Sequence, residues 1–210
     1  MENVLDFLIE IGKLKKMLRQ GWVLRGIKNP ECIASHTFRM AVMAWLLGEE
    51  RKLNICKIIK MSLIHDICEV YAGDATPYHP FLLNNKKLPK GLTETWPRFS
   101  KKEKEKIFYE KHKKEDKALR AIILKLPPLL RNEIVSLWDD YEKGLTPEGR
   151  FVRQLDRVEN LLQALEYRQE GKNFSMNPWW IQIEELVDDP VLIDFIKVLE
   201  RKFNKKCLNH

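Results

Sequence analysis

Two histidines and three acidic residues lie in segments of this sequence that are otherwise largely apolar. His65, Asp66 and Glu69 fall in SLIHDICEVY. His36 falls in IASHTFRMAVMAW, and Asp156 falls in FVRQLDRVENLL. Burying an imidazole or a carboxylate in an apolar helix is costly unless the group is paired or binds a metal. Each residue alone has an ordinary explanation, such as a hydrogen-bonded core histidine or a helix-surface acid, but together they offer nitrogen and oxygen ligands to one ion.

Two imidazoles and two carboxylates suit a six-coordinate Mn, Fe, Co or Mg ion, or a Zn ion with water-filled positions. Such an ion meets both requirements of phosphate-ester hydrolysis, because it polarises phosphoryl oxygens and lowers the pKa of a bound water. Glu69 lies one turn beyond His65 and is predicted to accept the proton of that water or to hold the water in line. An arginine fork can bind two phosphate oxygens at once.

The elements that must carry these residues follow from the spacing of apolar residues. Apolar positions three and four apart, with capping residues such as Asn54, Ser100 and Thr146, predict a succession of helices. Their expected ranges are about 2–19, 32–50, 54–73, 100–126, 127–144, 147–170, 178–187 and 189–205. No alternating strand of useful length and no internal repeat is present. The chain is therefore predicted to be all-α, a compact bundle whose facing helices build one site.

Two segments lack a helical period. RQGWVLRGIKNPE is interrupted by two glycines and a proline and is predicted to be a loop. Residues 74–99 hold four prolines and are predicted to be a long irregular excursion that closes over the substrate. Trp22 and Trp96 lie in these segments and are expected at the site. The other four tryptophans are interpreted as packing residues: Trp45, Trp138, Trp179 and Trp180.

Familiar nucleotide-binding and hydrolase motifs are absent from the sequence. Two GxxxxG stretches, 21–26 and 144–149, are not followed by the Lys-Ser/Thr of a P-loop and do not follow a strand. There is no GxGxxG, HExxH or GxSxG. The segment 100–117 carries 8 Lys and 5 acids and is interpreted as a solvated helix face with i,i+4 pairs. Nucleic acid is therefore not the expected partner.

The composition limits the classes of protein further. The chain has 210 residues and a net charge of +7, which favours anionic partners, whether nucleotides, nucleic acid or lipid. No run approaches the roughly 18 apolar residues of a membrane span, and the N-terminus lacks the order of a signal peptide. The 4 cysteines form no CxxC pair, so reduced thiols are expected. These features predict a cytoplasmic protein with no membrane contact.

The order and spacing of the candidate ligands match a known pattern. His36, then His65 and Asp66 after 29 residues, then Asp156 about 90 residues later, resemble the H...HD...D signature of the HD-domain phosphohydrolases. GWVLRGIKNPECIASH, HDICEVYAGDATP and QLDRVENLLQALEY are similar to the subgroup that includes bacterial 5'-deoxynucleotidases and their eukaryotic HD-domain-containing relatives. The resemblance covers roughly residues 5–170.

The resemblance implies a metal site and two further acids. It implies that one divalent ion, whether Mn, Co, Fe, Mg or Zn, is held by four side chains: His36, His65, Asp66 and Asp156. It places Glu69 beside the metal-bound water and Asp74 at the sugar of the substrate. Both acids are expected to be catalytic, and Asp74 is expected to contact the substrate as well.

The substrate contacts depart from the family pattern at one position. Trp22 matches a tryptophan that packs on the nucleoside in the deoxynucleotidases. In the bacterial enzymes an arginine that holds the phosphate directly precedes this tryptophan, but Gly21 occupies the place here. Arg19, three residues before Trp22, is where the eukaryotic relatives carry their basic residue, and it is expected to reach the same phosphate. Two nearby basic residues are alternatives for this contact: Arg25 and Lys28.

The residues and the resemblance together predict a metal-dependent phosphomonoesterase. It would hydrolyse deoxyribonucleoside 5'-monophosphates to deoxynucleosides and phosphate. Because Gly21 departs from the pattern, another nucleotide stays open as the substrate, such as a triphosphate, a cyclic nucleotide or an alarmone. A non-catalytic, metal-stabilised module that binds RNA through the 100–117 helix is the alternative from a different class.

The resemblance also implies how the chain is organised. One HD domain is expected over residues 1–210, with a catalytic core over about 5–170 and C-terminal helices over about 178–205 packed on it. Family members often pair, so a homodimer is expected, with the Trp-rich C-terminal helices as its interface. The other expected partner is a small-molecule nucleotide.

Overall fold

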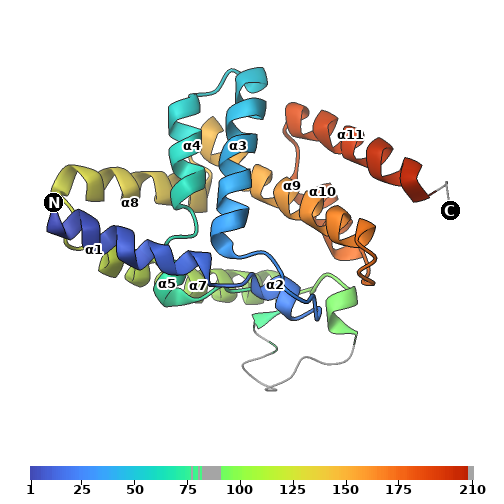
Figure 1. The fold of residues 1–210 in the computed structure, drawn as a ribbon, viewed down its shortest axis with the longest axis horizontal. Coiled ribbons are helices and arrows are strands. Elements are labelled where there is room, and N and C mark those ends of the chain that lie inside the picture. The colour runs from blue at the N-terminus through green and yellow to red at the C-terminus, as the bar shows by residue number, and fades with distance from the viewer. Residues whose placement is uncertain (77, 80, 82–90, 208–210) are drawn as a thin grey trace.

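The described part of the chain is all-α (Figure 1). The structure, a computed structural model, describes residues 1–76, 78, 79, 81 and 91–207, with side chains up to residue 203. Within these residues the regular elements are helices, and one isolated β-bridge joins Leu18 to Cys32. The prediction of an all-α fold is confirmed. None of the described helices has both the length and the apolarity needed to cross a membrane.

The described part of the chain holds a succession of helices. In chain order they are α1 (Glu2–Ile11), the 3-10 turn η1 (Gly12–Lys15), α2 (Gln20–Val23), α3 (Ile33–Arg51), α4 (Ile55–Ile64), α5 (Glu69–Ala72), the 3-10 turn η2 (Leu92–Glu94), α7 (Lys101–Ile123), α8 (Pro128–Lys143), α9 (Pro147–Gln169), α10 (Asn177–Leu186) and α11 (Pro190–Cys207). The predicted boundaries of the helices from residue 100 onward agree with these to within a few residues.

α3 and α4 form a hairpin at the centre of the molecule (Figure 1). Lys52 ends α3 in a left-handed conformation with φ 56°, and the Asn54 side chain caps α4 by accepting from Lys57 N at 3.0 Å. Gly48 lets the two helices approach closely, because a Cβ there would lie 2.2 Å from Ile58 Cδ1. The close approach brings the polar residues of α3 next to the end of α4.

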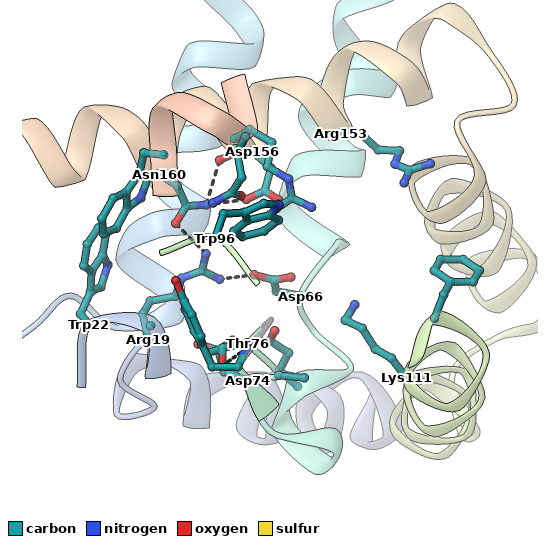
Figure 2. A pocket seen from close by; sticks show the side chains of 18 of the residues that line it. Arg19, Trp22, Asp66, Asp74, Thr76, Trp96, Lys111, Arg153, Asp156 and Asn160 are labelled. Atoms are coloured by element: carbon teal, nitrogen blue, oxygen red, sulfur yellow. Dashed lines mark hydrogen bonds and ion pairs between the residues drawn. The ribbon is translucent and has the colours of Figure 1, made fainter. Parts of the chain in front are cut away.

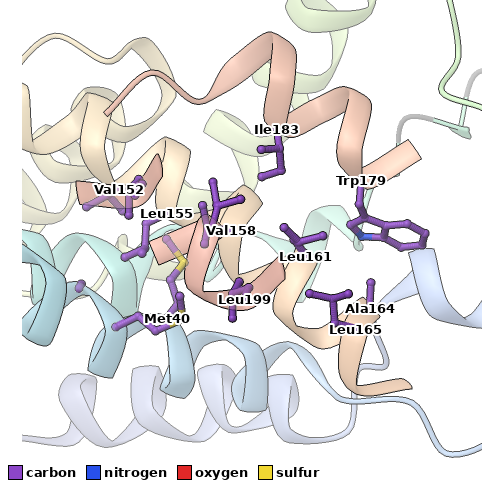
Figure 3. Packing of buried hydrophobic residues seen from close by; sticks show 14 of the residues in the cluster. Met40, Val152, Leu155, Val158, Leu161, Ala164, Leu165, Trp179, Ile183 and Leu199 are labelled. Carbon is purple, nitrogen blue, oxygen red and sulfur yellow. The ribbon is translucent and has the colours of Figure 1, made fainter. Parts of the chain in front are cut away.

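α9 packs against this hairpin and against α8, α10 and α11. Val152, Leu155 and Leu161 of α9 are fully buried among side chains from these neighbours (Figure 3). Burying a side chain of this size contributes roughly 1.5–3 kcal/mol. Asp156 and Glu159 lie on the same helix and are buried as well. α9 therefore carries carboxylates into the middle of the core.

α7 and α1 cover a second apolar cluster, which includes Leu119, Ile123 and Trp138. Ser100 caps α7 by accepting from Glu103 N at 3.3 Å, while the Glu103 side chain accepts from Ser100 N at 2.8 Å. The pairs Lys106–Glu110 and Asp116–Arg120 lie on the exposed face of α7 at i,i+4 spacing, whereas Lys111 pairs with Glu115, which is buried. The 100–117 segment is therefore a solvated face only in part. This helix closes the side of the molecule opposite α9.

The predicted helix over 2–19 is too long. α1 ends at Ile11, a 3-10 turn follows, and the chain is extended at Arg19, where Arg19 N donates to Glu31 O at 3.1 Å. The apolar spacing continues past Ile11 because the 3-10 turn η1 buries Leu14. The spacing of apolar residues therefore does not reveal that the α-helix ends at Ile11. The predicted loop that follows contains the short helix α2. The extended segment at Arg19 lies beside the start of α3, through the bridge described above.

The predicted helix over 54–73 is interrupted where the chemistry lies. α4 ends at Ile64 and α5 begins at Glu69, with a turn over residues 65–68. There the backbone bonds shorten to i→i−3, as in Glu69 N to Asp66 O at 3.0 Å. No Gly or Pro marks this turn, so the sequence pattern could not reveal it. His65 and Asp66 therefore lie in a turn rather than on the face of a continuous helix.

The interpretation of Trp45 as a packing residue is wrong. Its side chain is 54% exposed on α3, and Val42 and Leu46 beside it are exposed too. α3 is apolar nearly all round, so its period does not say which side is covered. The three other tryptophans assigned to packing are buried or partly buried against the core.

The segment 74–99 is predicted to be irregular and to close over the substrate. Of this segment, residues 77, 80 and 82–90 lie outside the described residues.

Candidate active site

A cavity of about 320 Å³ opens between α9 and the segments around α2, α5 and α7 (Figure 2). Residues from opposite ends of the chain line it, from Arg19 to Gln182. Its described lining includes five basic and five acidic side chains: Arg19, Arg25, Lys111, Arg153, Arg157, Asp66, Glu69, Asp74, Glu142 and Asp156. Aromatic side chains line other parts of the wall. The cavity is suited to a small ligand that carries both charge and a flat apolar group.

Two buried histidines from different elements meet behind Asp66 and Asp156, which line this cavity. The ring centres of His36 and His65 are 5.4 Å apart. Both side chains are buried, and Nε2 of each ring faces a carboxylate oxygen without making a hydrogen bond. One ligand atom from each of His36, His65 and Asp156 lies within 4.8 Å of the other two. Because unpartnered buried nitrogens are costly, the arrangement fits a cation held between these groups.

The other nitrogen of each ring has a fixed partner. His65 Nδ1 donates to Ser62 O at 2.7 Å. His36 Nδ1 pairs with the carboxylate of Glu159, which also accepts from Arg39 Nε at 2.8 Å. A carbonyl and a carboxylate accept hydrogen bonds, so Nδ1 of each ring carries a proton. This arrangement orients Nε2 of both rings for a metal, as partners of metal-binding histidines commonly do.

Asp66 lies next to both imidazoles. Its Oδ2 is 3.0 Å from His65 Nε2 and 4.0 Å from His36 Nε2. Asp156 Oδ1 is 3.3 Å from His36 Nε2. The structure thus brings together the four residues proposed as metal ligands, from α3, from the turn after α4 and from α9. This donor set of two nitrogens and two carboxylates fits a divalent ion.

The electrostatics of the cluster favour positive charge. Burial opposes ionisation of Asp156, but Arg157 and His36 hold its pKa well below the usual value. Burial likewise opposes ionisation of Asp66, yet His65 and Arg19 keep its pKa low. Burial and Arg19 lower the pKa of His36, but Glu159 and Asp156 outweigh them and raise it to about 10. The acids around His36 thus favour positive charge at the place where a metal ion would bind.

Glu69 and Asp74 lie on the same side of the cavity. Glu69 is buried, and its Oε2 has no hydrogen-bond partner. Burial and the negative charges of Asp66 and Asp74 raise the pKa of Glu69 well above its ordinary value. A carboxyl group that can hold a proton suits general acid–base chemistry. The Asp74 carboxylate accepts from Gln20 N at 2.7 Å and so joins the start of α2 to the cavity wall.

Arg19 reaches the cluster from the extended segment before α2. Its Nη1 donates to Asp66 Oδ2 at 3.1 Å, and its Nη2 donates to Asn160 Oδ1 at 3.1 Å (Figure 2). Burial lowers the pKa of Arg19, but Asp74 and Asp66 raise it well above the ordinary value, so the guanidinium stays charged. A charged guanidinium with free N–H groups beside the candidate ligands suits a phosphate.

The two alternative basic residues lie in different surroundings. Arg25 lines the cavity, but its guanidinium carbon lies 4.4 Å from the ring centre of Trp179. Its Nη2 donates to Tyr78 OH at 2.9 Å and to Thr93 O at 3.1 Å. Lys28 is exposed and is not among the residues that line the cavity. Of the three basic residues considered, Arg19 is the one bonded to a candidate ligand.

Trp22 lies deep in an aromatic cluster. It is only 2% exposed, stacks on Trp179 with ring centres 5.2 Å apart, and donates from Nε1 to Glu31 Oε1 at 2.9 Å. It lines the cavity together with Trp179 and Trp96. Contact between Trp22 and a nucleoside stays a prediction, since one face of its ring is covered by Trp179.

Sequence reasoning missed several residues that contact the cluster. Glu159 binds His36, Asn160 binds Arg19, and Arg157 Nη1 donates to Asp156 Oδ2 at 2.8 Å. All three follow Asp156 within about one turn of α9, and that spacing was the available signal. Lys111 also lines the cavity, from the helix interpreted as a solvated face. The sequence alone could not place that helix across the cavity from α9.

Comparison with known proteins identifies the class. The HD domain family matches residues 11–182, most of the chain. The chain belongs to the HD domain family. It is 36% identical over 168 residues to the 5'-deoxynucleotidase HDDC2 of Xenopus laevis, a match that covers 80% of this chain and 71% of the relative. The resemblance to this family predicted from the sequence is confirmed.

Solved structures agree with this assignment. A conserved hypothetical protein from Pyrococcus furiosus superposes with a TM-score of 0.66 at 26% identity and covers 96% of this chain and 99% of its own. A predicted metal-dependent phosphohydrolase from Magnetospirillum magnetotacticum superposes with a TM-score of 0.57 at 30% identity, over 79% of this chain and 72% of its own. The fold is thus that of the HD domain family, and the second of these neighbours is described as a predicted metal-dependent phosphohydrolase.

Proposed function

We propose that this protein is a metal-dependent phosphomonoesterase that converts deoxyribonucleoside 5'-monophosphates to deoxynucleosides and phosphate. The observation that carries the proposal is the meeting of His36 Nε2 and His65 Nε2, which make no hydrogen bond, with the carboxylates of Asp66 and Asp156. The Arg19 side chain binds Asp66 and so lies next to this cluster. The name of the similar relative, 5'-deoxynucleotidase, supports the same activity.

In this proposal each residue has a separate task. A divalent ion held by His36, His65, Asp66 and Asp156 would polarise the phosphoryl group and activate a water. Arg19 would bind phosphate oxygens with the N–H groups that it does not use on Asp66 and Asn160. Glu69 would take the proton of the attacking water, since its buried Oε2 has no hydrogen-bond partner and its raised pKa favours binding a proton.

The charge of the cavity favours a monophosphate over a longer phosphate chain. The five basic and five acidic side chains of the described lining cancel formally, apart from Glu69, whose raised pKa favours its neutral form. A divalent ion then leaves a surplus of two or three positive charges. A phosphomonoester carries about −1.5 to −2 at pH 7 and balances that surplus. A triphosphate would bring excess negative charge into a confined site, which is costly.

The nucleoside would occupy the aromatic part of the cavity. Trp96 and Trp179 line it, and Asp74 lines it on the side of α2. We propose that Asp74 contacts the sugar and that the tryptophans, Trp22 included, form the wall against which the base packs. Arg25 would support this wall, because it lies over the Trp179 ring and binds Tyr78 and Thr93.

Phosphate release from a nucleotide panel tests the proposal. The purified protein is loaded with Mn or Co and given deoxyribonucleoside and ribonucleoside monophosphates, triphosphates and cyclic nucleotides at equal concentration. Deoxyribonucleoside 5'-monophosphates are expected to be hydrolysed fastest. Activity that survives in both His65→Ala and Asp66→Ala would contradict the proposal. Steeply salt-dependent RNA binding without turnover of any ester would favour a binding module instead.

We also propose that the protein forms a homodimer, with α3 as the interface. Phe38, Val42, Trp45 and Leu46 form an exposed apolar stripe on α3, whereas Trp179 is buried within the chain and Trp180 packs on its core. The C-terminal tryptophans are therefore not free to pair, and a stripe on one helix can meet its copy across a twofold axis. A Trp45→Glu variant is expected to halve the mass measured by light scattering, and an unchanged mass would refute this interface.

We infer a single domain and a reducing compartment from two further observations. α10 and α11 contact α9, which carries part of the site, so the C-terminal helices extend the same core. The three described cysteines, Cys32, Cys56 and Cys68, are free thiols, as expected in the cytoplasm.

A further inference from the structure

The side-chain amide of Asn160 lies between two groups of the site that come from distant parts of the chain (Figure 2). Asn160 follows Asp156 by one turn of α9. Its Nδ2 donates to Asp156 Oδ1 at 3.0 Å and to Asp156 O at 2.9 Å. Its Oδ1 accepts from Arg19 Nη2 at 3.1 Å. One amide thus joins a candidate metal ligand to the candidate phosphate-binding arginine.

The direction of these bonds follows from the chemistry of the partners. A guanidinium only donates hydrogen bonds, while a carboxylate and a carbonyl only accept them. The amide oxygen must therefore face Arg19, and the amide nitrogen must face Asp156. A carboxylate at this position has no hydrogen to give Asp156, and an apolar side chain serves neither partner. Only a short amide side chain at position 160 can therefore accept from Arg19 and donate to Asp156 at once.

The oxygen of Asp156 that Asn160 contacts is the one that faces a candidate ligand. Asp156 Oδ1 lies 3.3 Å from His36 Nε2. The other oxygen, Oδ2, accepts from Tyr141 OH at 3.1 Å and from Arg157 Nη1 at 2.8 Å. Asn160 therefore fixes the rotation of the carboxylate from the side of the cluster, while the other two groups fix it from the far side.

Arg19 depends on this amide in the same way. Among the described residues its guanidinium has two side-chain partners, Asp66 on Nη1 and Asn160 on Nη2. A long side chain with one anchor keeps much of its rotational freedom, and a second anchor on the neighbouring nitrogen removes it. The remaining N–H groups then point in a fixed direction before any phosphate arrives, which reduces the cost of binding.

We propose that Asn160 is a positioning residue that couples the phosphate-binding arginine to the metal centre. It holds Arg19 and Asp156 in register, so that the phosphate and the ion meet at a fixed separation. The proposal rests on the proposed function, since it assumes that Arg19 binds the substrate phosphate. It predicts two separable effects of losing the amide, one on metal affinity and one on substrate affinity.

Metal affinity is measured first, without substrate, by Mn²⁺ titration followed by electron paramagnetic resonance. Asn160→Leu is expected to weaken Mn²⁺ binding about tenfold, because outer partners of metal ligands commonly contribute 10–100-fold. Asn132→Leu is the matched control, since Asn132 is exposed on α8 and does not line the cavity. Unchanged Mn²⁺ affinity in Asn160→Leu would overturn the part of the proposal that concerns Asp156.

Substrate affinity is then measured at saturating Mn²⁺ in a double-mutant cycle with Arg19→Met. Asn160→Leu alone is expected to raise KM about tenfold with kcat changed less than about threefold, as for a lost binding contact. In the Arg19→Met background it is expected to change KM no further, because Asn160 acts through Arg19. KM effects that multiply, or a wild-type KM in Asn160→Leu, would overturn the coupling.

These outcomes separate the inference from the proposed function. If the wild-type protein releases no phosphate from deoxyribonucleoside 5'-monophosphates, the proposed function fails. If the wild type is active but Asn160→Leu behaves like Asn132→Leu, the inference about Asn160 alone fails. Thermal unfolding of each variant shows whether it folds, and Asn160→Ala replaces Asn160→Leu should the larger side chain disturb α9.

Discussion

Two buried polar clusters lie along α9, and they differ in whether their polar atoms are paired. At the start of the helix, Asp140 accepts hydrogen bonds from Thr146 N at 2.8 Å and Thr146 Oγ1 at 2.6 Å, and it pairs with Lys57 Nζ at 2.7 Å. In the middle of the helix, Asp156 lies beside His36 and His65, whose Nε2 atoms have no hydrogen-bond partner.

The difference separates a structural cluster from a functional one. The paired cluster holds the corner between α8 and α9, because Asp140 joins the end of one helix to Thr146, the cap of the next. In the second cluster Asp156 accepts hydrogen bonds from Tyr141, Arg157 and Asn160, but the Nε2 atoms of the two histidines make none. Native proteins rarely leave buried polar atoms unsatisfied without a use. Substitutions in the first cluster should therefore affect stability, and those in the second should affect activity.

The largest expected effect is on activity, in the unpaired cluster. His65→Ala is expected to lower kcat/KM by about 10³-fold or more, because removing one member of a set of residues that act as a unit has effects of this size. It should also abolish the rise in melting temperature that Mn²⁺ gives the wild type, a rise expected because an ion bound only by the folded state stabilises it. Activity assays and thermal unfolding with and without Mn²⁺ measure both. If Mn²⁺ raised the melting temperature of His65→Ala as much as that of the wild type, the assignment of His65 as a metal ligand would be contradicted.

Glu159 lies behind the unpaired cluster, and its loss should have a smaller effect. Glu159→Gln removes the negative charge opposite His36 Nδ1 and is expected to weaken Mn²⁺ binding by 10–100-fold. Glu166→Gln is the matched control, because Glu166 also binds Arg39 but does not contact His36. Its affinity should change less than about twofold. Equal losses in the two variants, measured by calorimetric titration, would show that the effect comes from Arg39 instead.

The paired cluster should respond in stability alone. Asp140→Ala is expected to lower the free energy of unfolding by about 2 kcal/mol, since hydrogen bonds that involve charged groups contribute about 1.5–3 kcal/mol. Asp139→Ala, next along α8, removes an exposed pair with Lys143 and should lower it by less than about 0.5 kcal/mol. Urea unfolding gives both values. Specific activity of the folded Asp140→Ala protein should match the wild type, and a large loss would show that the two clusters are coupled.

The smallest expected effect is the pH dependence of the stability difference between the wild type and Asp140→Ala. Burial raises the pKa of Asp140, but hydrogen bonds from Lys57 and Thr146 outweigh burial and lower this pKa below its ordinary value of 3.8. A lowered pKa in the folded state stabilises the protein above the unfolded pKa, and this contribution is lost as the pH falls through the folded pKa. The stability gap between wild type and Asp140→Ala should therefore be constant from pH 7 to 5 and shrink below about pH 4. A gap that widened in acid would have the wrong sign.

Much of the site could be predicted because its residues are unusual in their segments. His36, His65 and Asp156 stand out as polar groups among apolar neighbours, and the structure brings them together. Glu159 and Asn160 do not stand out, since charged and amide residues are common on helix surfaces. Their importance follows from which face of α9 is covered, and local spacing does not give that face.

Two errors in the predicted elements have the same physical origin. The turn at residues 65–68 carries no Gly or Pro, and the apolar pattern runs through it without a change of period. Trp45 and Leu46 look like core residues on α3, yet they are exposed, while His36 on the same helix is buried. Apolar spacing records which residues avoid water, but it does not record which partner covers them or where a helix bends.

The amino-acid sequence was sufficient to specify the helices from residue 100 onward and the identity of the candidate ligands, because caps, periods and polar residues in apolar segments are local properties. The packing of α3, α9 and the turn after α4 determined the rest. It paired one buried cluster completely, left nitrogen atoms unpartnered in the other, and set Asn160 between Arg19 and Asp156. The bond between Arg19 and Asn160 joins residues 141 positions apart, so it exists only once the chain has packed.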